Sequence, residues 1–242
     1  MKDSEFDYSY LSQPSECGYL PEETSQLHYA VIEDLTPEYF SNMINKGWRR
    51  FGHILFRPMC PACTKCQPIR VLASRYKPNR SQRRVIKANQ GEVELRVVTP
   101  ELTKEKMLLY MAHHSDHALR KGWPEPSMKG GLEHLSTIIA GSFPVEEWCY
   151  FVNNRLVAVA YMDRLTDGYS GIYYFYDPSE RTRQLGTWIL ITMIQKSVEA
   201  GLPYAHLGYF VKGCTSMEYK GLFKPAEILH VDGVWRAAEI ME

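Results

Sequence analysis

Three regularly spaced cysteines followed by a long basic segment constrain this chain more than any other feature. Cys60, Cys63 and Cys66 lie three residues apart, and the segment from Lys46 to Lys87 holds twelve lysines and arginines but no aspartate or glutamate. Thiolates at a C-x2-C-x2-C spacing lie close enough to share one metal ion or cluster. An acid-free basic segment is typical of a protein that binds a polyanion. Together they predict a metal-organised contact with a nucleic acid.

The charge outside this segment has the opposite sign, although the formal net charge of the 242-residue chain is zero. Residues 1–45 carry one basic and nine acidic side chains, and residues 88–242 carry fifteen basic and nineteen acidic ones. The positive charge is therefore gathered in one block, as expected for a surface that binds a polyanion. A basic face that is only solvated is the alternative, and composition alone does not exclude it.

Length and composition predict a soluble protein with one large or two modest domains. The chain is 45% hydrophobic and 23% charged, as in ordinary globular proteins. It contains no run of eighteen apolar residues, and its N-terminus lacks the apolar core of a secretory signal, so we expect no membrane partner. Six cysteines without such a signal indicate the reducing cytoplasm, where clustered cysteines are more often metal ligands than disulfides.

Three thiolates leave a four-coordinate metal site incomplete, so a fourth ligand has to come from elsewhere in the chain. Cys149, Cys214 and the histidines are candidates, but Cys17, beside a glycine and close to the basic segment, is preferred. Spacing does not separate zinc from an iron–sulfur cluster, and reduced thiols packed under a loop are the alternative to any metal. The predicted metal ligands are Cys17, Cys60, Cys63 and Cys66.

The first 98 residues predict a smaller, cysteine-bearing α+β domain. Thr36 and Pro37 are residues preferred at the start of a helix. Alternating apolar residues then indicate strands on both sides of the cysteine loop. Gly91 and Pro100 bracket the predicted domain boundary, so that residues 1–98 form the first domain. The expected elements are a helix over 36–47, strands over 48–57, 67–76 and 93–98, and a short basic helix over 81–89.

Residues 99–242 predict an α/β domain of the acyltransferase (GNAT) type. Asn153-Asn154 separates two apolar runs and is able to adopt positive φ, which indicates a hairpin. The order hairpin, strand, helix, strand fits a central twisted sheet with a helix start that faces a phosphate. The expected elements are helices over 102–121, 132–140 and 184–200, and strands over 147–152, 155–163, 170–176 and 204–209.

Two further patterns in this half are weaker signals. Arg181 and Arg183 precede the long helix in a position that suits a phosphate, but the segment 179–186 has a single glycine and supports a pyrophosphate cradle poorly. His113 and His117 lie one turn apart and would hold zinc if a third ligand joined them. Because no partner motif is visible, we interpret them as part of a polar helix face.

The stretch 208–225 carries aromatic residues, a thiol and lysines at the end of a predicted strand. Sheets commonly open toward a ligand at such a position. A packed C-terminal turn without chemistry is the alternative interpretation.

Several ordered segments of the chain resemble the aminoacyl-tRNA–protein transferases. The resemblance extends from about residue 8 to 235 and is strongest to the bacterial branch, the aspartate/glutamate leucyltransferases, which are related to the eukaryotic arginyl-tRNA–protein transferases. The segments that carry it are Cys17-Gly18-Tyr19-Leu20-Pro21, Gly47-Trp48-Arg49-Arg50-Phe51-Gly52, Phe56-Arg57-Pro58, Pro68-Ile69-Arg70-Val71, Arg80-Ser81-Gln82-Arg83-Arg84, Tyr174-Phe175-Tyr176-Asp177-Pro178, Cys214, Met217-Glu218-Tyr219-Lys220 and Phe223-Lys224-Pro225.

This resemblance implies an enzyme that moves an amino acid, usually leucine, from its charged tRNA to the N-terminal amine of proteins beginning with Asp or Glu. Such proteins are thereby marked for N-degron proteolysis. It also implies a C-terminal acyltransferase-like domain that uses tRNA in place of coenzyme A, so no coenzyme A is expected. Eukaryotic relatives are associated with an iron–sulfur cluster, but their cysteine pattern differs from the triplet found here. Leucyl-tRNA is the expected donor, with arginyl-tRNA as the alternative.

For that reaction the chain offers candidate residues in both halves. Asp177 would hold the incoming α-ammonium or accept its proton, and Tyr209 and Tyr219 would donate hydrogen bonds to the oxyanion or to the leaving ribose hydroxyl. Lys220, or an arginine near it, would pair with the acidic side chain of the substrate, and Tyr176 and Met217 complete the predicted substrate-binding set. An aromatic residue such as Trp48 would stack a terminal base. The predicted tRNA-binding residues are Arg49, Arg50, Arg57, Arg70, Arg80, Arg83, Arg84 and Lys87.

Two other functions compete with this one. A coenzyme A-dependent N-acetyltransferase would have the same fold, but the poor glycine loop and the large basic block argue against it. A non-enzymatic, metal-stapled nucleic-acid-binding module would explain the first half, but not the long second half with its C-terminal motif.

Overall fold

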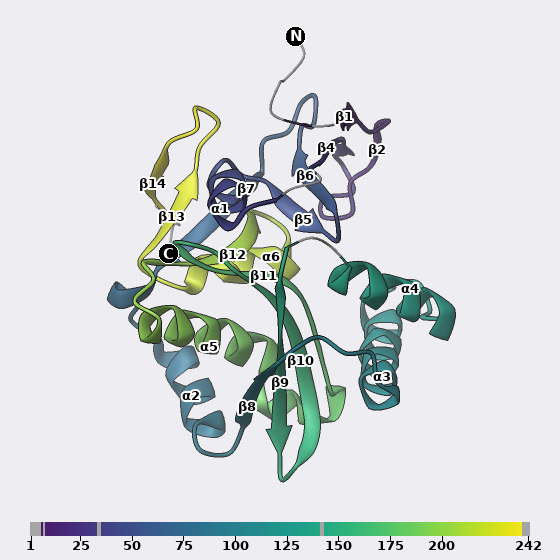
Figure 1. The fold of residues 1–242 in the computed structure, drawn as a ribbon, viewed down its shortest axis with the longest axis vertical. Coiled ribbons are helices and arrows are strands. Elements are labelled where there is room, and N and C mark those ends of the chain that lie inside the picture. Colours follow the sequence, from purple (N-terminus) through teal and green to yellow (C-terminus); the bar gives the residue numbers. More distant parts are fainter. Residues whose placement is uncertain (1–5, 7, 33–34, 141–142, 239–242) are drawn as a thin grey trace.

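An eight-stranded sheet forms the centre of the structure (Figure 1). The computed structural model describes residues 6, 8–32, 35–140 and 143–238. The strand order is β14-β13-β7-β12-β11-β10-β9-β8, and within the described residues β11 and β12 form the one parallel pair. The strands are β7 (Cys66–Leu72), β8 (Glu94–Val98), β9 (Val145–Val152), β10 (Arg155–Arg164), β11 (Gly168–Tyr176), β12 (Tyr204–Val211), β13 (Ala226–Leu229) and β14 (Trp235–Ala237).

Helices cover the two faces of this sheet, which gives the mixed α/β fold predicted from the sequence (Figure 1). The helices α2 (Arg80–Asn89) and α5 (Leu185–Glu199) pack on one face, where Val85 and Ile189 belong to the largest apolar core. The helices α3 (Lys104–Lys121) and α4 (Met128–Ile139) cover β9 to β11 on the other face. No helix of the described residues is both long enough and apolar enough to cross a membrane.

The predicted turn and the predicted order of elements in the second half are confirmed. Asn153 and Asn154 both have positive φ, +49° and +61°, and connect β9 to β10 as a two-residue turn. The predicted order of hairpin, strand, helix and strand is observed as β9–β10, β11, α5 and β12. A short 3-10 helix, η2 (Pro178–Arg183), joins β11 to α5.

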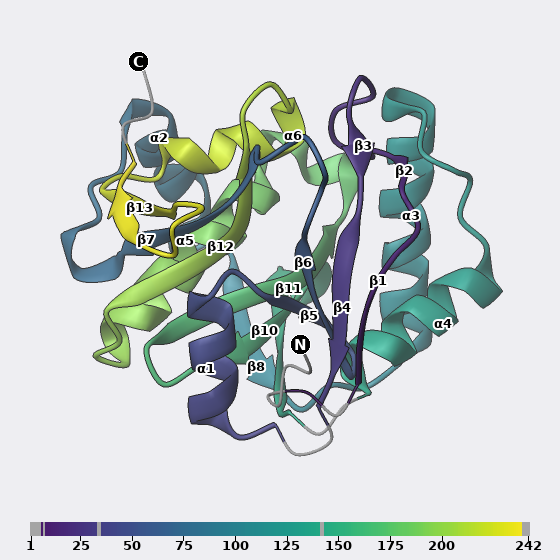
Figure 2. The same ribbon diagram turned by 90° about the horizontal axis from the view of Figure 1, so that it is seen from above.

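A second, four-stranded sheet stands beside the first, in the order β1-β4-β6-β5 (Figure 2). The helix α1 (Pro37–Asn45) packs on it, and the Thr36 hydroxyl caps this helix by accepting from the Tyr39 amide at 3.2 Å. Phe143 and Leu165 from the second half of the chain enter the same core. The strands are β1 (Tyr8–Leu11), β4 (Leu27–Val31), β5 (Arg49–Phe51) and β6 (Ile54–Pro58), and a separate pair consists of β2 (Ser15–Glu16) and β3 (Thr24–Ser25).

The prediction of one strand over residues 48–57 is wrong, because this segment is a hairpin of β5 and β6. Gly52 makes the turn with φ +61°, and a Cβ at this position would lie 2.6 Å from the backbone oxygen of Thr137. Both the backbone conformation and the close approach require glycine. The turn therefore fixes Arg49 and Arg50 on a strand that packs against the rest of the molecule.

The eight-stranded sheet includes residues from both sides of the predicted domain boundary. The strands β7 and β8 lie within residues 1–98, yet β7 pairs with β12 and β13, and β8 pairs with β9. The division into residues 1–98 and 99–242 therefore stays a prediction about folding units and does not describe the hydrogen-bonded sheet.

A buried ion pair joins the smaller sheet to the larger one. Arg50 Nε donates to both carboxylate oxygens of Asp163 on β10, at 3.0 and 3.1 Å, and Nη1 donates to the carbonyl oxygen of Gly52 at 3.1 Å. The guanidinium also lies 5.6 Å from the ring centre of Phe40 and 5.5 Å from that of Phe143. Burial raises the pKa of Asp163 to about 6 while Arg50 acts in the opposite direction. The pair fixes how the two sheets meet.

We expect Arg50→Ala to lower the free energy of unfolding by about 3–5 kcal/mol, because it leaves a buried carboxylate without its partner. The measurement is chemical denaturation of both proteins. Arg96→Ala is the matched control, because Arg96 forms an exposed pair with Glu94 and its loss should change stability little. Equal effects of the two substitutions would contradict a structural role for the Arg50–Asp163 pair.

Candidate active site

The parallel strands β11 and β12 are hydrogen-bonded at their beginnings and then diverge, and we call the region where their pairing has ended the opening between β11 and β12. They pair over three residues only, Gly168 to Ser170 with Tyr204 to His206, although both strands continue beyond. A register shift after His206 and positive φ at Gly208, +84°, turn β12 away at this point. An opening beyond the carboxyl ends of parallel strands is a common ligand site in α/β proteins.

Two tyrosine hydroxyls bridge this opening. Tyr174 on β11 shares a 2.6 Å hydrogen bond with Tyr219 of η3 (Tyr219–Leu222), which follows α6 (Thr215–Glu218). Burial raises the pKa of both hydroxyls, so both remain protonated near neutral pH. The predicted catalytic residue Tyr219 therefore lies at the opening with its hydroxyl available as a hydrogen-bond donor or acceptor.

Lys220 is buried next to the opening. Its ammonium donates to the carbonyl oxygen of Tyr209 at 3.2 Å and lies 3.5 Å from the sulfur of Met217. Burial, and then the nearby positive charge of Arg49, lowers the pKa of Lys220 to about 7. In the described part of the chain no carboxylate pairs with this ammonium. The structure thus brings the predicted substrate-binding residues Lys220 and Met217 together.

Arg49 is a second buried cation at the same place, with 6% of its surface exposed. Its guanidinium donates to the carbonyl oxygens of Ile44, Trp48 and Gly208, the last at 3.0 Å. Burial lowers its pKa. Among the described residues its partners are backbone carbonyls and not carboxylates, so Arg49 and Lys220 flank the turn at Gly208 as two positive charges without a counter-ion.

The predicted catalytic hydroxyl of Tyr209 is engaged inside the protein. It donates to the carbonyl oxygen of Gly47 at 2.9 Å, and burial raises its pKa. The Arg49 guanidinium lies 5.3 Å from the centre of the Tyr209 ring. This tyrosine therefore connects β12 to the end of α1 and holds Arg49 in place.

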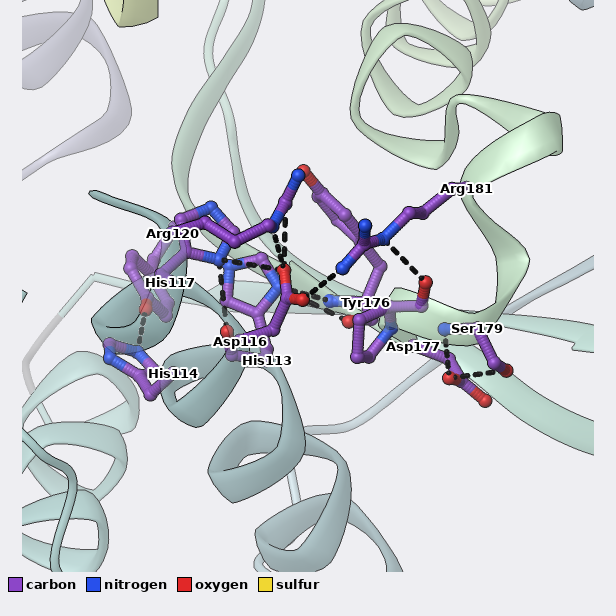
Figure 3. Close-up of polar contacts among 11 residues, drawn as sticks. His113, His114, Asp116, His117, Arg120, Tyr176, Asp177, Ser179 and Arg181 are labelled. Carbon is purple, nitrogen blue, oxygen red and sulfur yellow. Dashed lines mark hydrogen bonds and ion pairs between the residues drawn. The ribbon is translucent and has the colours of Figure 1, made fainter. Parts of the chain in front are cut away.

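Asp177 lies at the end of β11 and accepts from both the amide and the hydroxyl of Ser179, at 2.8 and 2.6 Å (Figure 3). It also forms an ion pair with Arg155. Burial alone would raise the pKa of Asp177, but the hydrogen bonds from Ser179 and Arg155 lower it. Its carboxylate is ionised near neutral pH and starts the η2 turn.

The histidines of α3 lie against the end of β11, a contact that no sequence pattern predicted (Figure 3). Nδ1 of His113 lies 3.1 Å from the carbonyl oxygen and 3.2 Å from the amide nitrogen of Tyr176, and its ring packs edge-on against the Tyr176 ring. Burial lowers the pKa of His113 to about 3, so it is neutral. Asp116, on the same helix, forms an ion pair with Arg181 of η2. In the sequence, only the grouping of His113, His114 and His117 on one helix indicated that this face was unusual. No spacing rule predicted that they would contact Tyr176.

The predicted tRNA-binding residues divide into a buried and an exposed group. Arg49, Arg50 and Arg70 are buried, and Arg70 pairs with Glu227 and Asn45. Arg57 lies over the ring of Trp48, at 4.7 Å, and Trp48 is itself buried and does not present a face for base stacking. The exposed group lies on α2 and consists of Arg80, Arg83, Arg84 and Lys87.

The four predicted metal ligands lie near one another. Burial, followed by the thiols of Cys17, Cys60 and Cys63, raises the pKa of Cys66 to about 12. All of them are free thiols. In the part of the chain that the structure describes, no group of three or more His, Cys, Asp or Glu side chains is arranged to hold a metal ion. The metal site therefore stays a prediction, and no step of the transfer reaction requires it.

The cysteines also lie beside the opening rather than at a distance from it. Cys66 is the first residue of β7 and pairs with Val211, the last residue of β12. Cys66 and Leu20 pack against Tyr209, Val211 and Cys214. Strand pairing thus brings Cys66 and Val211 together, although more than a hundred residues separate them in the sequence.

Two family models match the chain. The model described as "Arginine-tRNA-protein transferase, N terminus" matches residues 15–84, and the one described as "Arginine-tRNA-protein transferase, C terminus" matches residues 100–230. The chain belongs to the aminoacyl-tRNA–protein transferase family. The opening between β11 and β12, with Tyr219 and Lys220, lies within the second of these matches.

Curated members of the family are similar over nearly their whole length. The aspartate/glutamate leucyltransferase of Campylobacter jejuni is 35% identical over 92% of this chain and 93% of its own, and that of Pseudomonas fluorescens is 34% identical over 91% and 92%. Among solved structures, FemX has a TM-score of 0.48 at 8% identity, covering 89% of this chain and 83% of its own. L-PGS from Bacillus licheniformis has a TM-score of 0.45 at 11% identity, covering 74% and 52%.

The exposed face of α2 is expected to bind tRNA phosphates. Arg83→Ala combined with Arg84→Ala should weaken tRNA binding. It should also reduce the slope of log Kd against log salt by the amount that corresponds to the loss of about two phosphate contacts. Filter binding at several salt concentrations measures both quantities. A double substitution of the exposed residues Arg96 and Arg236, which lie on β8 and β14, serves as the control and should leave the slope unchanged. An unchanged slope for the α2 variant would refute this surface.

The predicted metal is tested by elemental analysis and absorbance of protein purified without oxygen. We expect one zinc or one iron–sulfur cluster per chain, lost in Cys63→Ser and retained in Cys149→Ser, because Cys149 is buried on β9 among other core residues. If the folded wild-type protein contains no metal, the prediction that these cysteines bind a metal ion or cluster is wrong.

Proposed function

We propose that this protein transfers leucine from leucyl-tRNA to the N-terminal α-amine of proteins that begin with Asp or Glu, with arginyl-tRNA as the alternative donor. The proposal rests on the family match, which covers both halves of the chain. Relatives named aspartate/glutamate leucyltransferase align over more than nine-tenths of the chain. The partners are accordingly a charged tRNA and a protein substrate.

The reaction is aminolysis of an ester. The α-amine attacks the ester carbonyl and the bond to the ribose oxygen breaks. The amine loses one proton, and the leaving ribose oxygen gains one and becomes a hydroxyl. Because an α-amine has a pKa of about 7.7–8.0, a fair fraction is already neutral and a weak base suffices. Positioning the two reactants and stabilising the oxyanion are then the main tasks of the protein.

The opening between β11 and β12, together with the end of β11, offers groups for these tasks. Tyr219, with its protonated hydroxyl hydrogen-bonded to Tyr174, is the proposed donor to the oxyanion or the leaving ribose hydroxyl. Asp177, which is ionised, is the proposed partner of the α-ammonium. Because the hydroxyl of Tyr209 donates to Gly47, we assign Tyr209 a positioning role instead.

Lys220 is the observation that best supports an acidic acceptor. A buried ammonium without a carboxylate partner is unfavourable, as its lowered pKa indicates. A carboxylate brought by the substrate would supply the missing counter-ion and restore the charge of the lysine. An N-terminal Asp or Glu carries such a group next to the amine that reacts.

The direct test is incubation with a peptide that begins with Asp, together with leucyl-tRNA, arginyl-tRNA or acetyl-CoA. Mass spectrometry should detect a peptide extended by one leucine. An acetylated peptide would favour the coenzyme A-dependent alternative. No extension with either charged tRNA would overturn the proposal.

Lys220→Met should reduce kcat/KM for the Asp peptide by roughly 30- to 1,000-fold, from the loss of about 2–4 kcal/mol. The same change should stabilise the fold by about 1–4 kcal/mol, because it removes a buried charge. The folded-state pKa of Lys220, about 7, lies below its ordinary value of 10.5. The buried ammonium therefore destabilises the wild-type fold fully below pH 7, and this destabilisation disappears as the pH rises toward 10.5. The stabilisation should fade over the same range.

Lys224→Met is the matched control, because Lys224 follows four residues later and is exposed. It should leave both transfer and thermal stability close to wild type. If Lys220→Met destabilised the protein as well as inactivating it, Lys220 would be a structural residue and the acceptor assignment would fail.

A further inference from the structure

A row of side chains crosses the four-stranded sheet on one face. Residues directly opposite one another in antiparallel strands point to the same side. The register places Tyr10 of β1 opposite Tyr29 of β4, Tyr29 opposite Phe56 of β6, and Phe56 opposite Arg49 of β5. These four residues, from Tyr10 to Arg49, form what we name the tyrosine row.

The tyrosine row leads from solvent to the opening in the large sheet. Tyr10 is 45% exposed and Tyr29 is half-buried. Phe56 packs against Tyr209, and Arg49 donates to the carbonyl oxygen of Gly208 at 3.0 Å. In Figure 2 the strands β1, β4 and β6 stand between α3 and the β7–β12 side of the molecule.

The outer end of the row presents aromatic faces. The rings of Tyr10 and Tyr29 stack with centroids 5.3 Å apart and planes inclined by 29°. Tyr8, on the same face of β1, is 62% exposed, and its ring lies 5.6 Å from that of Tyr10. Exposed aromatic rings in series are the usual platform for unpaired nucleic-acid bases, because every base has a face that stacks.

We propose that the tyrosine row binds the single-stranded 3′ end of the charged tRNA and guides its terminal ester into the opening between β11 and β12. This inference rests on the proposed function and adds the route by which the donor enters. From Tyr10 to Arg49 the row crosses three strand spacings, about 14 Å. That length matches roughly four stacked nucleotides at about 3.4 Å each.

Charge at the inner end favours a nucleic acid over a peptide. Arg49 keeps a positive charge that, among the described residues, no carboxylate neutralises, and the terminal phosphates of a tRNA would enter its field. Trp48, the residue that the sequence suggested for base stacking, is buried and leaves this role to β1 and β4. A peptide would instead pair with the backbone edge of β1 and would not need the rings.

The test compares binding of full-length uncharged tRNA with binding of the same tRNA lacking its last three nucleotides. Tyr10→Ala and Tyr29→Ala should each weaken binding of the full-length tRNA by about 5- to 100-fold and leave the trimmed tRNA unaffected. Tyr10→Phe keeps the ring and should bind as wild type does. Leu11→Ala is the matched control, because Leu11 is 50% exposed on the same strand but faces the other side.

Three results would overturn the inference. One is wild-type binding that does not depend on the last three nucleotides. Another is an equal loss for full-length and trimmed tRNA in the tyrosine variants, or an equal loss in Leu11→Ala. The third is an increase in KM for the Asp peptide with tRNA affinity unchanged, which would assign the row to the acceptor.

Because binding is measured without transfer, failure of the two proposals can be told apart. Binding of wild type that depends on the 3′ end and on Tyr10, combined with no aminoacyl transfer, would overturn the proposed function alone. Thermal unfolding of each variant confirms that a loss of binding does not come from a loss of fold.

Discussion

The position of β7 inside the large sheet, between β13 and β12, is the constraint on which the remaining arrangement depends. This strand belongs to the first third of the chain, but it is hydrogen-bonded to β12 over its whole length and to β13 on its other side. Its first residue is a cysteine, and the segment before it returns through β6 to the smaller sheet. The pairing therefore places Cys66 opposite Val211 at the end of β12, while Arg49 of the smaller sheet donates to the carbonyl oxygen of Gly208 on the same strand.

The charges of this region differ from those of the rest of the molecule in how they are compensated. Arg50, Arg70 and Arg183 are satisfied by acidic side chains of the protein. Arg49 and Lys220 are equally well enclosed but contact backbone carbonyls. Folding leaves their charges uncompensated, and substrates that bring phosphate and carboxylate would relieve this. In the proposed function, the same physical chemistry would therefore act on both the donor and the acceptor.

Sequence patterns predicted the parts of this molecule that local chemistry determines. The turn at Asn153-Asn154 and the cap at Thr36 are examples. Several ordered motifs in both halves of the chain together indicated the family, which the two family models confirm. The turn at Gly52 was missed because a single glycine within a segment that alternates like a strand is not sufficient to predict a hairpin. A count of twelve positive charges gave no information on burial, so Arg49, Arg50 and Arg70 could not be separated from the exposed arginines of α2. Contacts between residues far apart in the sequence decide which of these arginines are buried. Such contacts also bring His113 against Tyr176.

The central place of β7 also bears on how the chain folds during synthesis. β7 emerges from the ribosome long before its two partners, since Leu72 pairs with Tyr204 and Val71 with Ala226, more than 130 residues later. Until then both edges of an apolar strand remain unpaired, and pairings this distant in sequence form slowly. During most of its translation the nascent chain would therefore expose a strand that can pair with other chains. We expect chaperones that bind extended apolar segments to bind this strand.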